Sequence, residues 1–293
     1  MTLPLASAQA ARLEFLDECG STNTELLMRA ADAWPHFSVV ATTSQTAGRG
    51  RLDRVWVAPP GQTLAVSVLL RPTFPLEVYG WLPLIAGLAM ARAVDAALRQ
   101  AQGPEAAQGP EDSLPELVEG RGPRTTGAST SSATGPAPTV SLKWPNDVQV
   151  NGLKVAGLLA ELLPSADGVV IGAGLNLTIP ADALPTPNST SLMLHGGDTD
   201  VDRVLAAYLR ELKQLVTTFA DHGGDAVASG IRALVVQHCS TIGERVRVEL
   251  PGGETRFGEA TGIDEHGRLL FTDRADASVQ AVAAGDVTHL RYE

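Results

Sequence analysis

The chain has 293 residues, of which 44% are hydrophobic and 19% charged, an ordinary composition for a protein with a packed core. Its formal net charge of -11 argues against duplex DNA or an anionic membrane as a partner, because both need a positive protein surface. The sequence has no membrane-length apolar run, no signal-peptide core and no zinc-ligand spacing among its two cysteines and six histidines. We therefore expect a cytoplasmic protein.

The first hundred residues predict two helices and two strands. The polar stretch Ser21–Glu25 is typical of a helix N-cap, and a helix is expected over about Thr24–Ala33. Strands are predicted over Ser38–Ala41 and over the β-branched run Thr63–Leu70. Helical periodicity extends over Leu76–Arg99.

Residues 101–139 differ in composition from the rest of the chain. Of these 39 residues, 27 are Gly, Pro, Ala, Ser or Thr, and none is aromatic. Such a segment cannot bury enough apolar area to offset its ordering entropy. We interpret it as a disordered surface insertion between two core elements.

The second half of the chain predicts a strand series, two helices and a β-rich tail. Strands are expected over Thr139–Lys143, Val148–Val150, Lys154–Leu163 and Val169–Leu177, and helices over Asp202–Phe219 and Asp225–His238. From about Thr241 onward, five short strands predict a small β-barrel. The whole pattern indicates a mixed α+β core with a β appendage.

A loop from Gly48 to Trp56 concentrates positive charge in this acidic chain. Its two glycines, the second being Gly50, allow a ligand to approach the backbone closely. Its three arginines offer planar donors suited to phosphate or carboxylate. The loop is either an anion site or solvated surface, and its spacing alone leaves both readings open.

Two further segments are candidates for ligand contact. Lys154 opens an apolar strand, and it either extends to solvent or points a fixed cation into a cleft. The run Gly172–Asn176 lacks the third glycine of a dinucleotide-binding loop, and the chain has no phosphate-binding P-loop motif. Small residues in a strand either admit a flat ligand or pack tightly, and both remain open here.

Five segments, in the same order along the chain, resemble motifs of the biotin protein ligase family. They are STNT from Ser21, TSQTAGRGRLDRVW from Thr43, KWPNDV from Lys143, GLKVAGLLAEL from Gly152 and VVIGAGLNL from Val169. GRGR, KWPND and K-x-x-G-x-L-x-E are specific as a set. The tail, with Gly243–Val246 and Ala284–Val287, resembles the family's small Src-homology-3-like barrel less specifically.

The resemblance implies an α+β fold with a class II aminoacyl-tRNA-synthetase-like, biotin–lipoate ligase core. That core has a mixed, mainly antiparallel sheet and is expected over residues 1–240, with the barrel over residues 241–293. The implied activity uses ATP and Mg²⁺ to convert biotin to biotinyl-5′-adenylate. The biotinyl group then passes to one lysine of a biotin carboxyl carrier protein, a domain of acetyl-CoA carboxylase or a related carboxylase. Fixed cations suit this chemistry, because the biotin carboxylate and the α-phosphate repel each other.

The resemblance also assigns residues by position. Biotin contacts are expected from Ser21, Thr22, Asn23, Gln45, Arg49, Gly50, Arg51 and Lys154. Nucleotide contacts are expected from Gly48, Arg49, Arg51, Arg54, Trp56, Lys143, Asn146 and Asn176. Lys154, Arg49 and Arg51 are the expected catalytic residues, with Lys154 first. No metal is expected to be held directly by the protein, since Mg²⁺ arrives with ATP, although Asp147 is a candidate to contact it.

The sequence departs from the family pattern in two places. Asp53 stands where glycine is expected after GRGRx, and residues 101–139 are inserted before KWPND. The match begins near Leu13, which predicts an enzyme without a helix-turn-helix repressor domain. A lipoate or octanoate protein ligase of the same fold and a non-catalytic biotin sensor are the alternatives, and the chain is expected to be a monomer or a homodimer.

Overall fold

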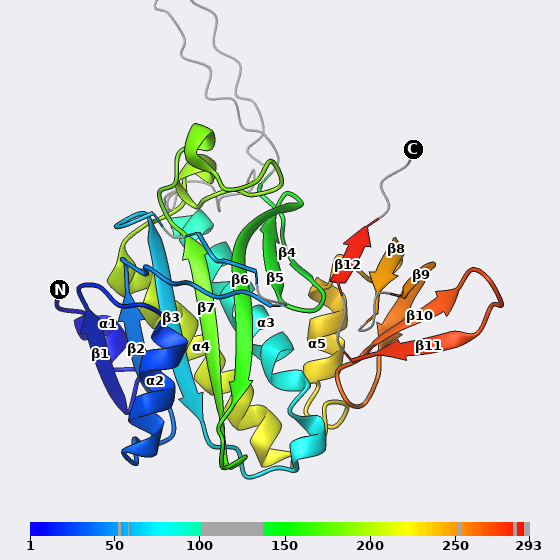
Figure 1. Cartoon of the computed structure of the whole chain (residues 1–293), viewed down its shortest axis with the longest axis horizontal. Helices are drawn as coiled ribbons and strands as arrows, with labels where there is room; N and C mark the ends of the chain where they lie inside the picture. The colour runs from blue at the N-terminus through cyan, green and yellow to red at the C-terminus, as the bar shows by residue number, and fades with distance from the viewer. Residues whose placement is uncertain (52–53, 58, 101–136, 251–253, 284–285, 290–293) are drawn as a thin grey trace, which may run out of the picture.

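The computed structural model describes the chain except for residues 52–53, 58, 101–136, 251–253, 284–285 and 290–293 (Figure 1). Asp53, most of the predicted insertion and the Ala284–Gly285 pair therefore lie outside the described residues. The larger sheet has the strand order β1-β2-β3-β7-β6-β5-β4. Its strands are β1 (Arg12–Leu16), β2 (Ser38–Thr42), β3 (Thr63–Leu70), β4 (Val140–Lys143), β5 (Asp147–Val150), β6 (Leu153–Leu162) and β7 (Val169–Asn176).

This sheet is mixed and mainly antiparallel, as the family resemblance implied. Only β1 and β2 pair in parallel, and every other neighbouring pair is antiparallel. The central strands β3 and β7 are buried along their whole length, which explains their continuous apolar and small residues. They form the rigid floor on which ligand-facing side chains can be held.

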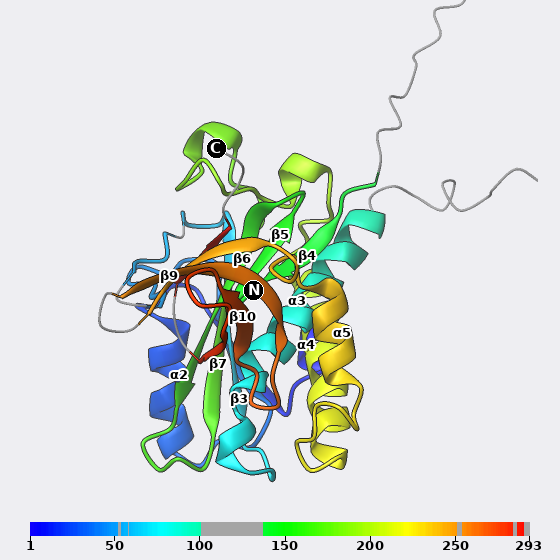
Figure 2. The same ribbon diagram turned by 90° about the vertical axis from the view of Figure 1, so that its right-hand side faces the viewer.

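Helices cover both faces of the larger sheet (Figure 2). Helix α2 (Thr22–Ala31) lies on one face, and α3 (Trp81–Gln100) and α4 (Val201–Asp221) lie on the other. The short helix α1 (Pro4–Ser7) is tied to α4, because the carboxylate of Asp202 accepts hydrogen bonds from the backbone N–H groups of Leu5 and Ala6 at 3.0 and 2.8 Å. The Asp200 side chain caps α4 by accepting from the backbone N–H of Arg203 at 2.9 Å.

Helix α3 is apolar on nearly all sides because it is the core helix of the fold. In the described part of the chain, it is the helix that is long and apolar enough to cross a membrane. However, 78% of its apolar window is buried inside the protein. Trp81, Leu82 and Ile85 at the start of α3 are completely buried in the hydrophobic core.

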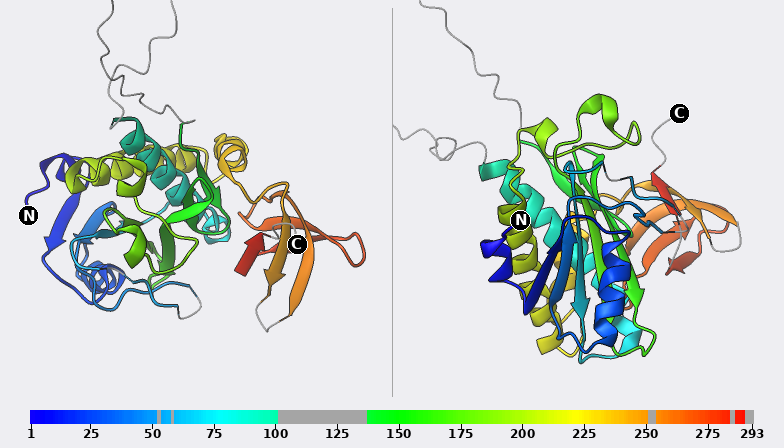
Figure 3. Two further views of the ribbon diagram at one scale, coloured as in Figure 1. Left: turned by 90° about the horizontal axis from the view of Figure 1, so that it is seen from above. Right: turned by 60° about the vertical axis from the view of Figure 1, so that its left-hand side comes forward.

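The tail forms a separate five-stranded antiparallel sheet of order β11-β10-β9-β8-β12. Its strands are β8 (Arg245–Glu249), β9 (Thr255–Ile263), β10 (Leu269–Asp273), β11 (Val279–Val282) and β12 (Asp286–His289). Seen from above, it stands beside α5 (Ile231–His238) at one side of the larger sheet (Figure 3). The prediction of five short strands is confirmed.

The two sheets are joined through the turn between β9 and β10. The Trp81 indole N–H donates to the Glu265 carbonyl at 2.8 Å, and the Trp144 indole N–H donates to the Gly267 carbonyl at 3.3 Å. The Trp144 backbone N–H donates to Thr241 Oγ1 at 2.9 Å. The turn after β4 is therefore fixed by hydrogen bonds from Trp144 to the C-terminal tail.

Several predicted boundaries were wrong. Helix α2 begins at Thr22, two residues early, with Ser21 in the N-cap position but making no side-chain cap hydrogen bond. The predicted helix over Leu76–Arg99 divides into a 3-10 turn, Leu76–Val78, and α3. Helix α5 begins only at Ile231, because Gly230 has a left-handed φ of 73° and the preceding residues form a turn.

Replacing Gly267 with alanine is expected to destabilise the protein more than the same change at Gly243. Both glycines have left-handed backbones, with φ of 81° and 85°, so each alanine costs about 1–2 kcal/mol. A Cβ on Gly267 would also lie 2.8 Å from the Gly80 carbonyl oxygen, whereas one on Gly243 meets open space. We expect Gly267→Ala to lose a further ~1 kcal/mol in free energy of unfolding, measured by chemical denaturation. Equal losses of unfolding free energy in Gly267→Ala and Gly243→Ala would contradict close packing between Gly267 and Gly80.

Candidate active site

A cavity of about 490 Å³ opens between the start of α2, the arginine loop and the strands β6 and β7. The described residues that line it include five cationic side chains, Arg49, Arg51, Arg54, Lys143 and Lys154, and one carboxylate, Asp147. In a chain with a net charge of -11, this is a local concentration of positive charge. The cavity is therefore suited to an anionic ligand.

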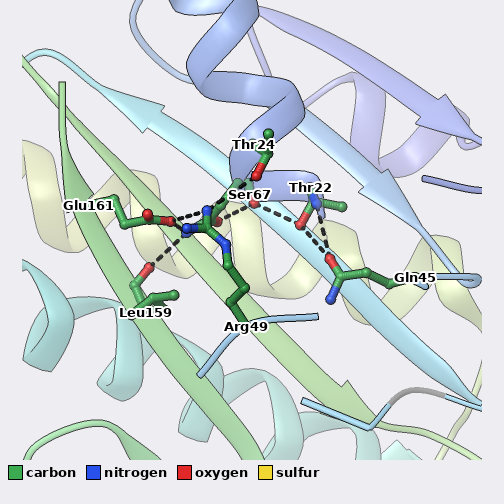
Figure 4. Close-up of polar contacts among 8 residues, drawn as sticks. Thr22, Thr24, Gln45, Arg49, Ser67, Leu159 and Glu161 are labelled. Carbon is green, nitrogen blue, oxygen red and sulfur yellow. Dashed lines mark hydrogen bonds and ion pairs between the residues drawn. The ribbon is translucent and has the colours of Figure 1, made fainter. Parts of the chain in front are cut away.

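The start of α2 contributes a network of hydrogen bonds at one end of the cavity (Figure 4). Gln45 Oε1 accepts from the Thr22 backbone N–H at 2.9 Å and lies 3.3 Å from Thr22 Oγ1. On β3, Ser67 Oγ lies 2.8 Å from Thr22 Oγ1 and 2.6 Å from Asn23 Oδ1. These buried or partly buried groups form a rigid polar end that can recognise an uncharged polar ring.

Gln45 lies in the segment between β2 and the arginine loop. Strand β2 ends at Thr42, and Gln45 lies beyond it in an isolated bridge with Cys19. The bridge still brings Gln45 to the start of α2, so its side chain reaches the predicted neighbours. Burial raises the pKa of the Cys19 thiol to about 11, which leaves this cysteine un-ionised near neutral pH.

Strands β6 and β7 form the floor of the cavity. Their registers place Gly157 opposite Gly174 and Leu159 opposite Gly172. A Cβ on Gly174 would collide with the Trp56 indole, and a Cβ on Gly172 would collide with the Asn23 amide. The glycines in this buried strand therefore let two flat groups of the protein itself lie against the backbone.

The turn after β4 and the start of β6 carry the opposite, charged end. Lys154 Nζ forms a 2.6 Å ion pair with Asp147 Oδ1, and it lies 5.6 Å from the centroid of the Trp56 ring. The Lys154 backbone is fixed by hydrogen bonds with Asn188 and Thr190, each 2.8 Å long. Lys154 therefore lines the cavity, so of the two alternatives left open by the sequence, the structure favours a cation in a cleft.

Arg51 faces the same end. Its Nη1 lies 3.5 Å from Asn146 Oδ1, and the Asn146 amide is fixed by donation to the Leu158 carbonyl at 2.6 Å. Burial lowers the pKa of the Arg51 guanidinium, and the nearby Asp147 carboxylate opposes that shift. A partly buried guanidinium of this kind interacts strongly with an anion that replaces water around it.

Two buried polar atoms at the cavity lack a hydrogen-bond partner among the described residues. They are the indole N–H of Trp56 and Oδ1 of Asn176. The Asn176 amide is oriented by donation from its Nδ2 to the Thr190 carbonyl at 2.9 Å, which leaves Oδ1 as an acceptor. An unpaired acceptor and an unpaired donor in the lining of one cavity can bind a heteroaromatic base.

The structure brings almost every predicted site residue to this one cavity. Fourteen of them line it: Ser21, Thr22, Asn23, Gln45, Arg49, Gly50, Arg51, Arg54, Trp56, Lys143, Asn146, Asp147, Lys154 and Asn176. Gly48 does not line it, and its small size is needed because a Cβ would meet the Trp56 backbone. The sequence interpretation missed Ser67 and Glu161, although Glu161 ends the K-x-x-G-x-L-x-E motif.

Comparison with known proteins identifies the group to which this fold and cavity belong. A model described as the biotin/lipoate A/B protein ligase family matches residues 18–176, more than half of the chain. The chain belongs to this family. A second model, described as the biotin protein ligase C terminal domain, matches residues 241–290.

The relatives described next are named as biotin ligases. Biotin--[acetyl-CoA-carboxylase] ligase of Mycobacterium tuberculosis is 37% identical over 283 residues, covering 96% of this chain and 90% of that protein. The Aquifex aeolicus biotin protein ligase in complex with biotin and ATP shares the fold. It has a TM-score of 0.67 and 24% identity over 96% of this chain and all of that one. The Leishmania major biotin protein ligase in complex with biotinyl-5-AMP has a TM-score of 0.56 and 26% identity. The match covers 94% of this chain and 99% of that one.

Proposed function

We propose that this chain is an ATP-dependent biotin ligase that forms biotinyl-5′-adenylate and transfers biotin to a lysine of a biotin carboxyl carrier protein. One observation carries the proposal: a neutral hydrogen-bonding end and a strongly cationic end meet in one cavity. Biotin has the matching pattern, a polar ureido ring at one end and a carboxylate at the other. The biotin ligases among the chain's relatives support this assignment.

In the first step, a biotin carboxylate oxygen attacks the α-phosphorus of MgATP. The new oxygen–phosphorus bond forms as the bond to the bridging oxygen breaks, and pyrophosphate leaves. Ser21, Thr22, Asn23 and Gln45 hold the ureido end, so the carboxylate lies toward Lys154. Lys154 and Arg51 stabilise the negative charge that gathers on the phosphorus and its leaving group.

The nucleotide lies across the floor beside Trp56. Asn176 Oδ1 accepts a hydrogen bond from the base, and Asn146 places Arg51 near the phosphates. Arg54 and Lys143 line the same cavity, and Gly48 packs against the Trp56 backbone behind it. The Asp147 carboxylate is already paired with Lys154, and the described residues contain no group of three or more His, Cys, Asp or Glu side chains that could hold a metal. Mg²⁺ would enter with the ATP substrate, and Asp147 is the carboxylate in the cavity lining that could contact it.

In the second step, the neutral amine of the acceptor lysine attacks the biotinyl carbonyl carbon. The bond from this carbon to the phosphate oxygen breaks, AMP leaves, and the nitrogen loses a proton to solvent. The arginine loop, with Arg49, Gly50 and Arg51, closes over biotin and the phosphates and keeps water from the reactive anhydride. We assign this chemistry to a catalytic domain over residues 1–240 and a small barrel domain over residues 241–293. The acceptor is the biotin carrier of acetyl-CoA carboxylase or a related carboxylase, in the cytoplasm.

The transfer step tests the whole proposal. The protein is incubated with MgATP, biotin and the biotin carrier domain of an acetyl-CoA carboxylase, and mass spectrometry follows modification of the carrier. We expect biotin on the wild-type carrier and none on a carrier whose acceptor lysine is replaced by arginine. Modification of a lipoyl domain with lipoate, but not of the biotin carrier, would assign the chain to the lipoate ligases instead.

A further inference from the structure

Glu161 joins the two functional parts of the cavity through a single oxygen atom. The residue lies near the end of β6, and its side chain is 24% exposed. Its Oε2 accepts from Asn23 Nδ2 at 2.6 Å and from Arg49 Nη2 at 2.9 Å (Figure 4). One carboxylate thus contacts both the start of α2 and the arginine loop.

The first consequence concerns the orientation of the Asn23 amide. An ionised carboxylate can only accept hydrogen bonds, so it fixes Nδ2 of Asn23 toward itself. Oδ1 of Asn23 must then accept from Ser67 Oγ, 2.6 Å away. Ser67 Oγ also lies 2.8 Å from Thr22 Oγ1, whereas the Gln45 amide is oriented separately by the Thr22 backbone N–H. The charge of Glu161 therefore sets the direction of the hydrogen bonds from Asn23 to Ser67 at the polar end of the cavity.

The second consequence concerns Arg49. Its Nη2 donates to Glu161 and also to Thr24 Oγ1 at 3.2 Å, so this guanidinium is tied to β6 and α2. Its positive charge is largely balanced by the Glu161 carboxylate. The two arginines of the GRGR motif are therefore not equivalent. Arg51 faces the charged end beside Asn146, whereas Arg49 fastens the loop over the polar end.

We propose that Glu161 is a positioning residue for biotin adenylation, acting through Asn23 and Arg49 rather than by touching the reacting atoms. It sets the hydrogen-bonding pattern that receives the neutral end of biotin, and it anchors the arginine loop to the sheet. The activity part of this inference rests on the proposed function. The anchoring part rests on the ion pair alone and has its own readout.

The Glu161→Gln substitution tests the inference, because glutamine keeps the size of the side chain and removes its charge. Since charge-assisted hydrogen bonds are about twice as strong as neutral ones, we expect the biotin KM to rise about tenfold, with kcat changed less than about threefold. Trypsin should cleave the Gly48–Trp56 loop at least about threefold faster, since the loop loses its anchor. Glu161→Asp, which keeps the charge, should restore part of the biotin KM.

Glu14→Gln is the matched control, because Glu14 pairs with Arg29 at 2.8 Å outside the cavity lining. This control should leave the biotin KM and loop cleavage unchanged, even if its melting temperature falls. The proposal would be overturned if Glu161→Gln kept the biotin KM and the loop-cleavage rate of the wild type. A lower melting temperature of this variant would not rescue the proposal if both of those quantities were unchanged. If the wild type shows no biotin-dependent activity, the proposed function fails, and loop cleavage still decides whether Glu161 anchors Arg49.

Discussion

Lys154→Ala is expected to slow biotin adenylation by about 10²–10³-fold while weakening biotin binding less than about tenfold. A unit charge about 4 Å from an anion is worth about 4 kcal/mol at an effective dielectric of about 20. That interaction strengthens as charge builds on the pentacoordinate phosphorus, so its loss falls mainly on the chemical step. The substitution also leaves the Asp147 carboxylate without its 2.6 Å partner, directly beside the incoming phosphates.

Single-turnover formation of biotinyl-adenylate and equilibrium biotin binding separate the two effects. Lys213→Ala is a suitable control, because Lys213 lies on α4 near the Phe37 ring and outside the cavity lining. The control should show wild-type rates. Equal losses of binding and of adenylation in Lys154→Ala would make Lys154 a ground-state contact only and would contradict its catalytic role.

Arg51→Ala is expected to raise the ATP KM about tenfold and to increase the release of biotinyl-adenylate to solvent. Arg51 is a partly buried cation, and its contact Asn146 is held by a hydrogen bond to the Leu158 carbonyl of β6. Arg51 can therefore meet the phosphates without reorganising. Its loss also opens the loop that shields the anhydride from water.

Radiolabelled ATP measures both quantities in one experiment, as KM in the adenylation step and as free adenylate in the filtrate. Arg210→Ala, an exposed arginine on α4, serves as the control. An ATP KM within about twofold of the wild type, together with unchanged adenylate release, would contradict a role for Arg51 at the phosphates. The same assay on Arg49→Ala would show whether the two arginines differ as their contacts indicate.

The fold was largely predictable wherever local pattern and tertiary environment agree. Strand β3 was predicted with its correct ends, because a continuous β-branched run suits a strand buried on both faces. The α5 boundary was not predictable, because the left-handed Gly230 interrupts a segment that is otherwise compatible with a helix. The early start of α2 was missed because Thr22 and Asn23 look like cap residues, but their side chains bond to Gln45 and Glu161 instead.

The lining of the cavity was predictable as a set of residues but not as a geometry. Lys154 and Asp147 could be named from their motifs, yet their ion pair depends on how β5 and β6 pair across a bulge. Glu161 was overlooked because a carboxylate at the end of an apolar strand is usually solvated. Its role depends on contacts with residues 112 and 138 positions away in the chain. Such contacts arise only from the strand order of the folded sheet.

Pyrophosphate–ATP exchange by the purified protein, with biotin and with lipoate as separate acids, tests the central claim most directly. The proposed mechanism predicts exchange that requires both biotin and Mg²⁺ and that is absent with lipoate. Exchange with lipoate alone would contradict the assignment of substrate. Tight biotin binding without exchange of either acid would show that the cationic cavity clamps a ligand without activating it, which would contradict the claim that the chain is a ligase.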